Sequence, residues 1–293
     1  MNPLHGIREL YRRMSPCVLC PHRCGARRLE GERGRCGAGA EIELASATIH
    51  NGEEPPISGT LGSGTLFFTH CPLSCLYCQN WPISQQGVGR KMSADGLAER
   101  MLQLQRRGVH NINLVNPTHY WPQIAAAVYL ARARGLRVPV LANIHGFENT
   151  ETLRLLADVV QIWLPDVKTL SSRFAGEICG TPRLAVASWQ TLEFLATLSG
   201  PLQVDENGLA LRGVLVRHLV LPGGRSDTPR FLRRLRRRFR GRIPVSLMTQ
   251  YFPAHRAHDN PVFQRPLSRP VRRRAHRLAR ALHLSRGWRQ MNG

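Results

Sequence analysis

The sequence predicts an α/β protein built around a parallel sheet, and three features of the chain indicate it. From Gly64 onward, short apolar runs bounded by turn residues alternate with segments of helical periodicity. There are six of each, in alternation. Residues 1–60 lack this pattern and are rich in Gly, Pro and Cys. Strands buried on both faces give continuous apolar runs, and their alternation with helices is typical of parallel α/β folds.

The elements follow one another in a regular order. The expected strands are residues 65–69, 111–116, 138–143, 159–164, 213–221 and 244–248. The expected helices are residues 94–107, 121–134, 150–157, 183–199, 229–240 and 270–284. In the helix 229–240, Phe231, Leu232, Leu235 and Phe239 share one face and arginines cover the other. Length does not distinguish an open sheet from a barrel, and both gather ligands at the carboxyl ends of their strands.

We expect two units in the chain. Residues 1–60 are predicted to form an irregular, Cys-rich metal-binding segment, and residues 61–293 the α/β unit. The 293 residues, 42% of them hydrophobic, suffice for a full core. No run approaches the ~18 apolar residues of a membrane helix, and residues 1–14 lack the apolar stretch of a secretory signal. We therefore expect a soluble, cytoplasmic protein without a membrane partner, in which eight cysteines indicate metal or redox chemistry rather than disulfides.

The charge of the chain favours an acidic partner. The balance of 41 basic and 19 acidic residues gives +22, and 19 arginines after residue 224 face only Asp227 and Asp259. Such a field attracts nucleic acid, phospholipid headgroups or an acidic redox protein. The alternative is a solvated, Arg-rich helix surface without a partner.

A cluster of three cysteines carries the strongest chemical signal. Cys71, Cys75 and Cys78 form a CxxxCxxC motif at the end of the first expected strand. Three thiolates on one short loop suit a cubane iron–sulfur cluster that leaves one iron open. A structural zinc site would need a fourth ligand, and none lies nearby in the sequence. Three buried structural thiols are the remaining alternative.

This motif resembles that of the radical S-adenosylmethionine (SAM) enzymes, including the aromatic Tyr77 before the last cysteine. Longer motifs resemble the branch of pyruvate formate-lyase activating enzyme, over roughly residues 17–285. They are GEEPPISG at 52–59, GSGT at 62–65, CQN at 78–80, IS at 83–84, NPTH at 116–119, LPDVK at 164–168, RHLVLP at 217–222 and QY at 250–251. The resemblance implies a partial (β/α)6 barrel with a [4Fe–4S] cluster on Cys71, Cys75 and Cys78 and SAM on its open iron. It further implies reductive SAM cleavage to a 5′-deoxyadenosyl radical, which in known activases abstracts a glycine hydrogen of a partner enzyme.

The resemblance also implies roles for residues at the strand ends. Asp166 and Lys168 match an Asp-x-Lys motif, in which the Asp lies near the SAM carboxylate and a cation. Arg217 and His218 match a pair whose His faces SAM. We therefore expect Asp166, Lys168 and His218 as catalytic residues, with Asp166 and His218 also binding SAM.

The chain departs from its relatives after the second strand, where activases hold the SAM amine with Gly-Gly-Glu. Here NPTH occupies residues 116–119, and His70 replaces the usual Gly before Cys71. We expect Asn116 or Thr118 to bind the amine. Asn143, at the end of the third expected strand, and Tyr77 in the cysteine loop are also expected to bind SAM at the same rim of the fold.

A second cysteine set precedes the α/β unit. Cys17, Cys20, Cys24 and Cys36 lie within twenty residues of a Gly-rich segment with few apolar residues. Such a segment is expected to fold around zinc or a second iron–sulfur cluster, and spacing does not distinguish the two. Cys179 is expected to be a structural thiol.

Three functions fit these patterns to different degrees. The first is an activase-like radical SAM enzyme with a protein substrate and an acidic flavodoxin- or ferredoxin-like electron donor. The second is a radical SAM enzyme that modifies RNA or a small molecule, which the positive charge permits although no RNA-binding motif with interleaved aromatics is present. The third, a zinc-ribbon nucleic-acid binder, leaves CxxxCxxC and the six strands unexplained. We predict the first.

Overall fold

A computed structural model describes residues 3–284 and 289–290 of the chain. Its strands are β1 (Ile42–His50), β2 (Ser63–Phe68), β3 (Arg90–Met92), β4 (Ile112–Val115), β5 (Val140–Ile144), β6 (Ile162–Pro165), β7 (Gln203–Val204), β8 (Ala210–Val214), β9 (Val216–Leu219), β10 (Val245–Met248) and β11 (Arg289–Gln290). Its α-helices are α1 (Pro3–Arg12), α2 (Pro55–Ser58), α3 (Trp81–Ser84), α4 (Ala94–Arg106), α5 (Trp121–Ala133), α6 (Thr150–Arg154), α7 (Ser172–Cys179), α8 (Leu184–Leu198), α9 (Thr228–Phe239) and α10 (Arg269–Ala281). Each of the six expected helices and five of the six expected strands has one counterpart at nearly the same residues, whereas the expected strand 213–221 is divided into β8 and β9.

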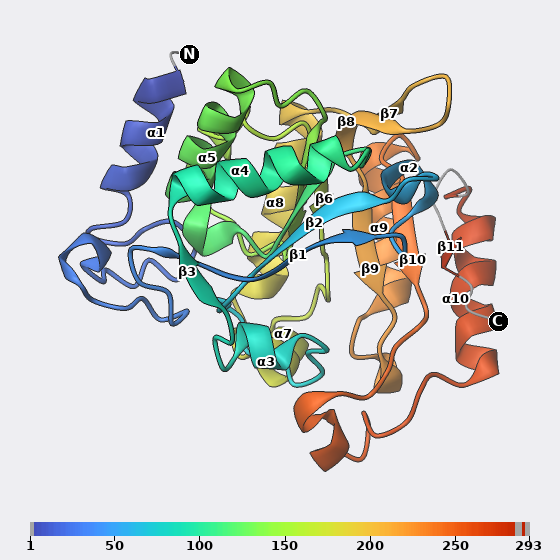
Figure 1. Cartoon of the computed structure of the whole chain (residues 1–293). Helices are drawn as coiled ribbons and strands as arrows, with labels where there is room; N and C mark the ends of the chain where they lie inside the picture. Colours follow the sequence, from blue (N-terminus) through green and yellow to red (C-terminus); the bar gives the residue numbers. More distant parts are fainter. Residues whose placement is uncertain (1–2, 285–288, 291–293) are drawn as a thin grey trace.

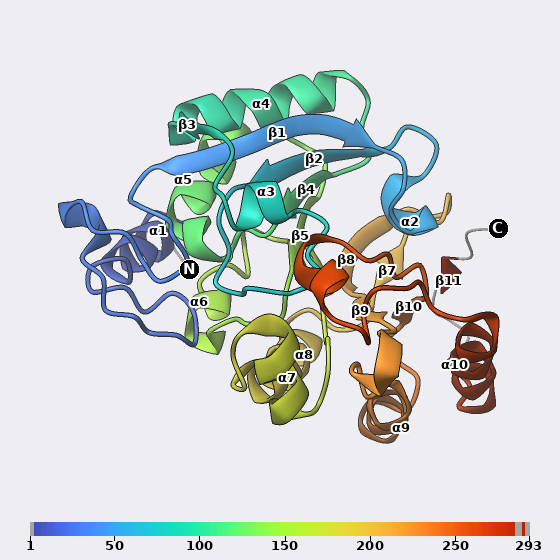
Figure 2. The same ribbon diagram turned by 90° about the horizontal axis from the view of Figure 1, so that it is seen from below.

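The strands form a curved, mostly parallel sheet. Strands β2, β4, β5, β6 and β8 pair in parallel in that order, and β9, β10 and β11 continue in parallel. Because only Leu215 separates β8 from β9, and Asp166 bridges Arg217, the two sheets follow one continuous curve. Seen along the strands, the sheet forms an arc with α4, α5, α8 and α9 outside it (Figure 2). This architecture confirms the predicted α/β partial barrel.

The sheet begins before the expected boundary at residue 61. Strand β1 pairs antiparallel with β2 on one side and with β3 on the other, so residues 42–50 belong to the sheet. The sequence prediction omitted α1, α2, α3, α7, β1, β3, β7 and β11, of which α2, α3, β3, β7 and β11 have only two to four residues. Among the described residues, no helix has the length and apolarity needed to cross a membrane.

Apolar side chains fill both sides of the sheet. The main core lies between the sheet and the outer helices, and in α9 the residues Phe231, Leu232, Leu235 and Phe239 are buried there as predicted. A smaller cluster fills the inside of the barrel, where Ile57 of α2 packs with Leu141, Ile162, Leu164 and others.

The Cys-rich segment is anchored to the barrel by polar contacts. The Arg28 guanidinium is fully buried and donates to the carbonyls of Gly39 and His119, the latter at 2.8 Å. Thr152 donates to the carbonyl of Leu19 at 3.1 Å. The segment lies beside α5 and α6, on the opposite side of the molecule from α9 and α10 (Figures 1 and 2).

Candidate functional site

The loop with the three cysteines follows β2 and is fixed by backbone hydrogen bonds. Ser74 N–H donates to the Cys179 carbonyl at 3.1 Å, and Leu76 N–H donates to the Ile178 carbonyl at 3.0 Å. The last residues of α7 therefore hold the cysteine loop in place through these backbone hydrogen bonds. This support places Cys71, Cys75 and Cys78 at the carboxyl end of β2, where parallel α/β folds gather ligands.

All three cysteines line one cavity of about 210 Å³ together with polar residues from the neighbouring strands. Asn116 follows β4, Asn143 lies near the end of β5, and Asp166 follows β6. A second cavity of about 300 Å³ shares Cys75, Cys78, Asn143, Asp166 and Lys168 with the first. It extends along β9 and β10 to Arg217, Gln250 and Phe252, the last of which is exposed. The two adjoining cavities provide room for a cluster, a ligand on it and a path to the surface.

The electrostatics of the cysteines suit a cationic cluster. Burial and the charges of Cys75 and Cys78 raise the pKa of the Cys71 thiol well above its ordinary value. Burial also raises the pKa of Cys78, whereas a hydrogen bond from Cys179 and the charge of Lys168 lower the pKa of Cys75. Three adjacent thiolates repel one another in a buried site unless positive charge lies among them. Iron would supply that charge, so the donor set fits an iron–sulfur cluster.

Neither set of cysteines is arranged around a single metal ion in the described part of the chain. Within residues 3–284, no group of three or more His, Cys, Asp or Glu side chains is arranged to hold one metal ion. In a cubane cluster each thiolate binds a different iron, so the ligands lie farther apart than around one ion. The three cysteines on one cavity wall meet the requirement of a cluster.

Asp166 and Lys168 form an ion pair beside the cysteines. Lys168 Nζ lies 2.5 Å from Asp166 Oδ2, and both side chains are mostly buried. Although burial opposes it, the charges of Asp166 and Cys75 raise the pKa of Lys168 above its ordinary value. The pair therefore presents a fixed ammonium and a fixed carboxylate to the cavity.

Asn116 supplies an acceptor without a partner. Its backbone has a φ of +59°, a left-handed conformation that Asn tolerates better than most residues. The side-chain Nδ2 donates to the carbonyl of His70, and the buried Oδ1 has no hydrogen-bond partner among the described residues. A buried amide oxygen on a cavity wall is suited to accept from a ligand ammonium.

The structure places two of the sequence-predicted ligands away from both cavities. The Thr118 hydroxyl is buried between His145 and Glu148. His218 bonds to the Val167 carbonyl at 2.6 Å and to Thr228 Oγ1 at 2.9 Å, and it stacks on Phe231. Because side chains alternate along β9, Arg217 points into the barrel and His218 toward α9. Tyr77 lines the second cavity, where its ring stacks on Phe263.

Paired acidic residues hold Arg217 in the barrel interior. Arg217 donates to Glu54 Oε1 at 2.9 Å and also contacts Glu53, whose Oε1 accepts from Asn113 at 3.0 Å. Both glutamates come from the GEEPPISG segment before β2. In the sequence, two adjacent carboxylates before a Pro-Pro helix start mark these glutamates as unusual. No feature of the sequence indicates that Arg217 is their partner.

A close approach of two strand ends shapes the wall of the site. Gly146 follows β5 with a φ of +77°, and a Cβ at this position would lie 2.2 Å from the Asp166 carbonyl oxygen. Only glycine permits this contact. It holds His145, which lines the first cavity, next to the Asp166 segment.

The structure places the four N-terminal cysteines near one another, although among the described residues they are not arranged around a single ion. Cys17 and Cys24 share a side-chain hydrogen bond, and the sulfurs of Cys24 and Cys36 both lie beside Gly34. Burial and the nearby Cys36 and Cys17 raise the pKa of Cys20 to about 12. Cys179, by contrast, is buried beside Cys75.

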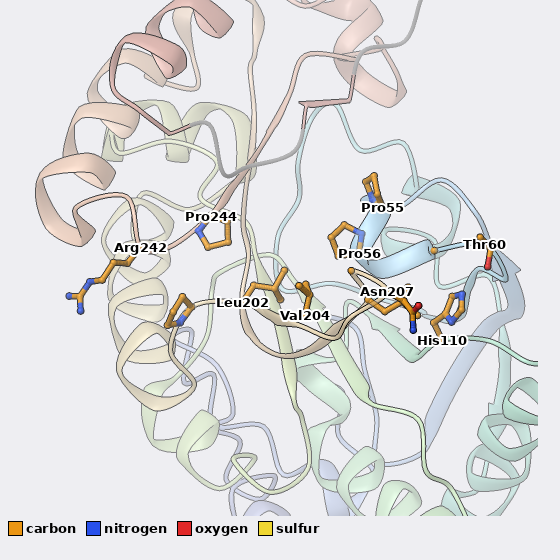
Figure 3. Close-up of a pocket in the computed structure, with 13 residues that line it drawn as sticks. Pro55, Pro56, Thr60, His110, Leu202, Val204, Asn207, Arg242 and Pro244 are labelled. Atoms are coloured by element: carbon orange, nitrogen blue, oxygen red, sulfur yellow. The ribbon is translucent and has the colours of Figure 1, made fainter.

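The largest of these cavities lies elsewhere, at the opposite ends of the strands (Figure 3). It has a volume of about 950 Å³ and includes Pro55, Pro56, His110, Arg242 and Pro244 in its wall. His110 precedes β4 and Pro244 precedes β10, so this hollow opens at the amino ends of the strands. It contains none of the cysteines, and the chemistry of the barrel is concentrated at the other end.

Comparisons with known proteins agree with this location of the site. Residues 65–186 match the model of the radical SAM superfamily. The uncharacterized protein MJ0674 of Methanocaldococcus jannaschii is 27% identical over 263 residues, covering 86% of this chain and 70% of that protein. The uncharacterized protein MJ0808 of the same organism is 27% identical over 157 residues, covering 48% of this chain and 46% of that protein.

Two solved structures share the fold. HydG, a maturase of the [FeFe]-hydrogenase, has a TM-score of 0.52 at 12% identity, covering 75% of this chain and 49% of that chain. Streptococcus suis SuiB bound to the precursor peptide SuiA has a TM-score of 0.51 at 12% identity, covering 75% and 46%. The chain thus spans about half the length of these two proteins, and at this identity the likeness concerns the fold alone. The match over residues 65–186 and the cavity of Cys71, Cys75 and Cys78 make this part of the chain similar to the radical SAM superfamily, whose members cleave SAM at an iron–sulfur cluster.

Proposed function

We propose that the chain is an activating-enzyme-like radical SAM oxidoreductase that abstracts hydrogen from a protein partner. The observation that carries the chemical part is the single cavity shared by Cys71, Cys75 and Cys78 with Asn116, Asn143 and Asp166. When bound there, a [4Fe–4S] cluster with SAM would supply a 5′-deoxyadenosyl radical. The residues of the chain bind and orient this cofactor and keep water from the radical.

The polar wall suits the two ends of the amino-acid part of SAM. The unpartnered Oδ1 of Asn116 accepts from the amine, and the Lys168 ammonium attracts the carboxylate. Asp166 fixes Lys168 and keeps it charged, since burial alone would lower the pKa of Lys168. His218 supports this wall by binding the carbonyl of Val167, between Asp166 and Lys168.

A direct experiment tests the cluster. After anaerobic reconstitution with iron and sulfide, dithionite should drive formation of 5′-deoxyadenosine by the wild-type protein, and Cys75→Ala should abolish it. Thr197→Ala, an exposed position on α8 that lines neither cavity, is the control and should leave the product unchanged. Undiminished product from the Cys75→Ala variant would contradict the assignment.

We also propose a second metal site on Cys17, Cys20, Cys24 and Cys36, holding zinc or iron–sulfur. The four thiols lie near one another in a segment whose own apolar cluster, around Met14 and Leu19, is small, so a bound metal would add to its stability. Metal analysis of a Cys71/Cys75/Cys78 triple-Ala variant isolates this site. Absence of both zinc and iron would refute it, and an ultraviolet–visible spectrum distinguishes the two metals.

The partner surface that we propose is the Arg-rich face of α9 and α10, which lie side by side (Figure 2). It consists of exposed arginines: Arg230, Arg233, Arg237, Arg238, Arg269, Arg273, Arg274, Arg277 and Arg280. Within the described residues, ion pairs engage only Arg230 and Arg238 of these. The remaining charges favour an acidic electron donor of the flavodoxin or ferredoxin kind.

RNA is the alternative partner, because the same arginines suit phosphates. A binding assay with tRNA over a range of salt concentrations distinguishes it from the donor. Salt-sensitive tRNA binding that Arg273→Glu abolishes, without loss of donor-driven turnover, would favour RNA.

A further inference from the structure

A buried carboxyl group lies directly behind the wall of the first cavity. The Glu148 side chain, just after β5, has no exposed surface. Thr118 Oγ1 donates to Glu148 Oε1 at 2.5 Å, and Trp121 Nε1 donates to Oε2 at 3.3 Å. Both carboxylate oxygens therefore accept from neutral donors that are themselves buried.

A chain of hydrogen bonds joins this carboxyl to the cavity. The Phe147 N–H donates to His145 Nδ1 at 3.0 Å, so the proton of the ring is on Nε2, which donates to Thr118 Oγ1 at 3.1 Å. Burial lowers the pKa of His145 well below its ordinary value, which keeps the ring neutral. His145 itself lines the cavity beside Asn116 and Asn143.

The carboxyl lacks a cationic partner in the described part of the chain. The group in salt-bridge range is the neutral His145 ring, 3.7 Å away. Burial raises the pKa of Glu148 to about 7, although Thr118 and Trp121 oppose the rise. The charge of Glu148 contributes to the raised pKa of Cys20. The charges of Lys168, His119 and His22 contribute to the lowered pKa of His145. A buried carboxylate is costly until a positive charge approaches it.

We propose that Glu148 is a positioning residue for the amino group of SAM. Its carboxylate attracts the ligand ammonium to the side of the cavity that Asn116 and His145 form, and it fixes the His145 ring through Thr118. The inference rests on the proposed function, because it assumes SAM in the cavity. Activases hold the amine with the Glu of a Gly-Gly-Glu segment, whereas residues 116–119 of this chain, NPTH, contain no acidic residue. Glu148 would supply the missing negative charge.

A thermodynamic cycle on ligand and protein tests the assignment. Isothermal titration calorimetry on the reconstituted protein would compare S-adenosylhomocysteine with its deamino analogue, which lacks the ammonium. Glu148→Gln keeps the shape of the side chain and should weaken S-adenosylhomocysteine binding about tenfold, the usual size of one charge coupling, while leaving the analogue unchanged. Glu151→Gln is the matched control, since that carboxylate is half exposed and pairs with Arg13, and it should change neither affinity.

Two outcomes would overturn the proposal: equal weakening of both ligands by Glu148→Gln, which indicates a merely structural role, or no weakening of either. Failure of the wild-type protein to bind S-adenosylhomocysteine would instead contradict the proposed function itself.

A measurement on the wild-type protein covers the case in which the variant does not fold. The preference for S-adenosylhomocysteine over its deamino analogue should fall as the pH decreases from 8 to 6, because Glu148 takes up a proton near pH 7. A preference that does not change with pH would overturn the assignment.

Discussion

Replacing Arg217 with Met probes the charged centre of the barrel. The substitution removes the cation that pairs with Glu53 and Glu54, of which Glu54 has no exposed side-chain surface and Glu53 only 11%. Removing one partner of a buried ion pair leaves an uncompensated charge and costs about 3–5 kcal/mol. We expect a loss of this size in the free energy of unfolding at pH 7, measured by anaerobic urea denaturation followed by tryptophan fluorescence.

The pH dependence gives this prediction its sign. In the wild-type protein the Arg217 charge overcomes burial and lowers the pKa of Glu54, so the pair stabilises the fold above the unfolded pKa of Glu and loses this contribution at lower pH. In the Arg217→Met variant, burial without the cation favours the protonated form of Glu54, so protonation removes the unpaired charge. The stability difference between the proteins should therefore shrink as the pH falls from about 7 to about 4.

A compensating variant separates charge from packing. Combining Arg217→Met with Glu53→Gln and Glu54→Gln removes all three charges and should recover most of the lost stability at pH 7. If the single variant is as stable as wild type, or if its deficit is the same at pH 4 and pH 7, the interpretation of the centre as a buried charge network is wrong.

Three further outcomes follow from the site. Asp166→Asn should weaken SAM binding about tenfold by calorimetry with the cluster absorbance intact, because Lys168 loses the carboxylate that orients it; unchanged affinity would refute this role. His218→Ala should instead lower the free energy of unfolding by about 2–4 kcal/mol, since it removes the stack on Phe231 and two hydrogen bonds, and a purely SAM-binding defect at full stability would contradict it. The rate of donor-driven SAM cleavage should fall as salt rises from about 0.05 to about 0.5 M. At low salt, Arg273→Glu on the Arg-rich face should also reduce this rate, whereas the control Arg100→Glu on α4 should not. A rate that changes neither with salt nor in the Arg273→Glu variant would exclude steering by this face.

The α/β class and the order of the elements were predictable because parallel strands and amphipathic helices have distinct apolar periods. Strand 65–69 and helix 229–240 illustrate this, since each lies at nearly the predicted residues in β2 and α9. Several elements that escaped prediction are too short to carry a pattern. Helix α3 has four residues, and in the longer β1 only Ile42 and Leu44 are buried.

The residues of the candidate site also fall into a group that the sequence predicts and a group that it does not. Placement of Cys71, Asn116, Asn143 and Asp166 on one rim needs only the rule that parallel strands end at the same edge. The facing direction of His218 depends on the register of β9, because a shift of one residue would exchange it with Arg217.

The sequence by itself therefore determined the elements, the three-cysteine loop and the strand ends that accompany it, because these depend on local periodicity and spacing. Only the tertiary structure decided which distant charges meet. Glu54 and Arg217 are 163 residues apart, and Glu148 is linked to the cavity-lining His145 through Thr118, 30 residues earlier in the chain than Glu148. Contacts of this kind depend on how separate strands and loops pack against one another, and no pattern along the chain encodes the pairing of one particular carboxylate with one particular partner.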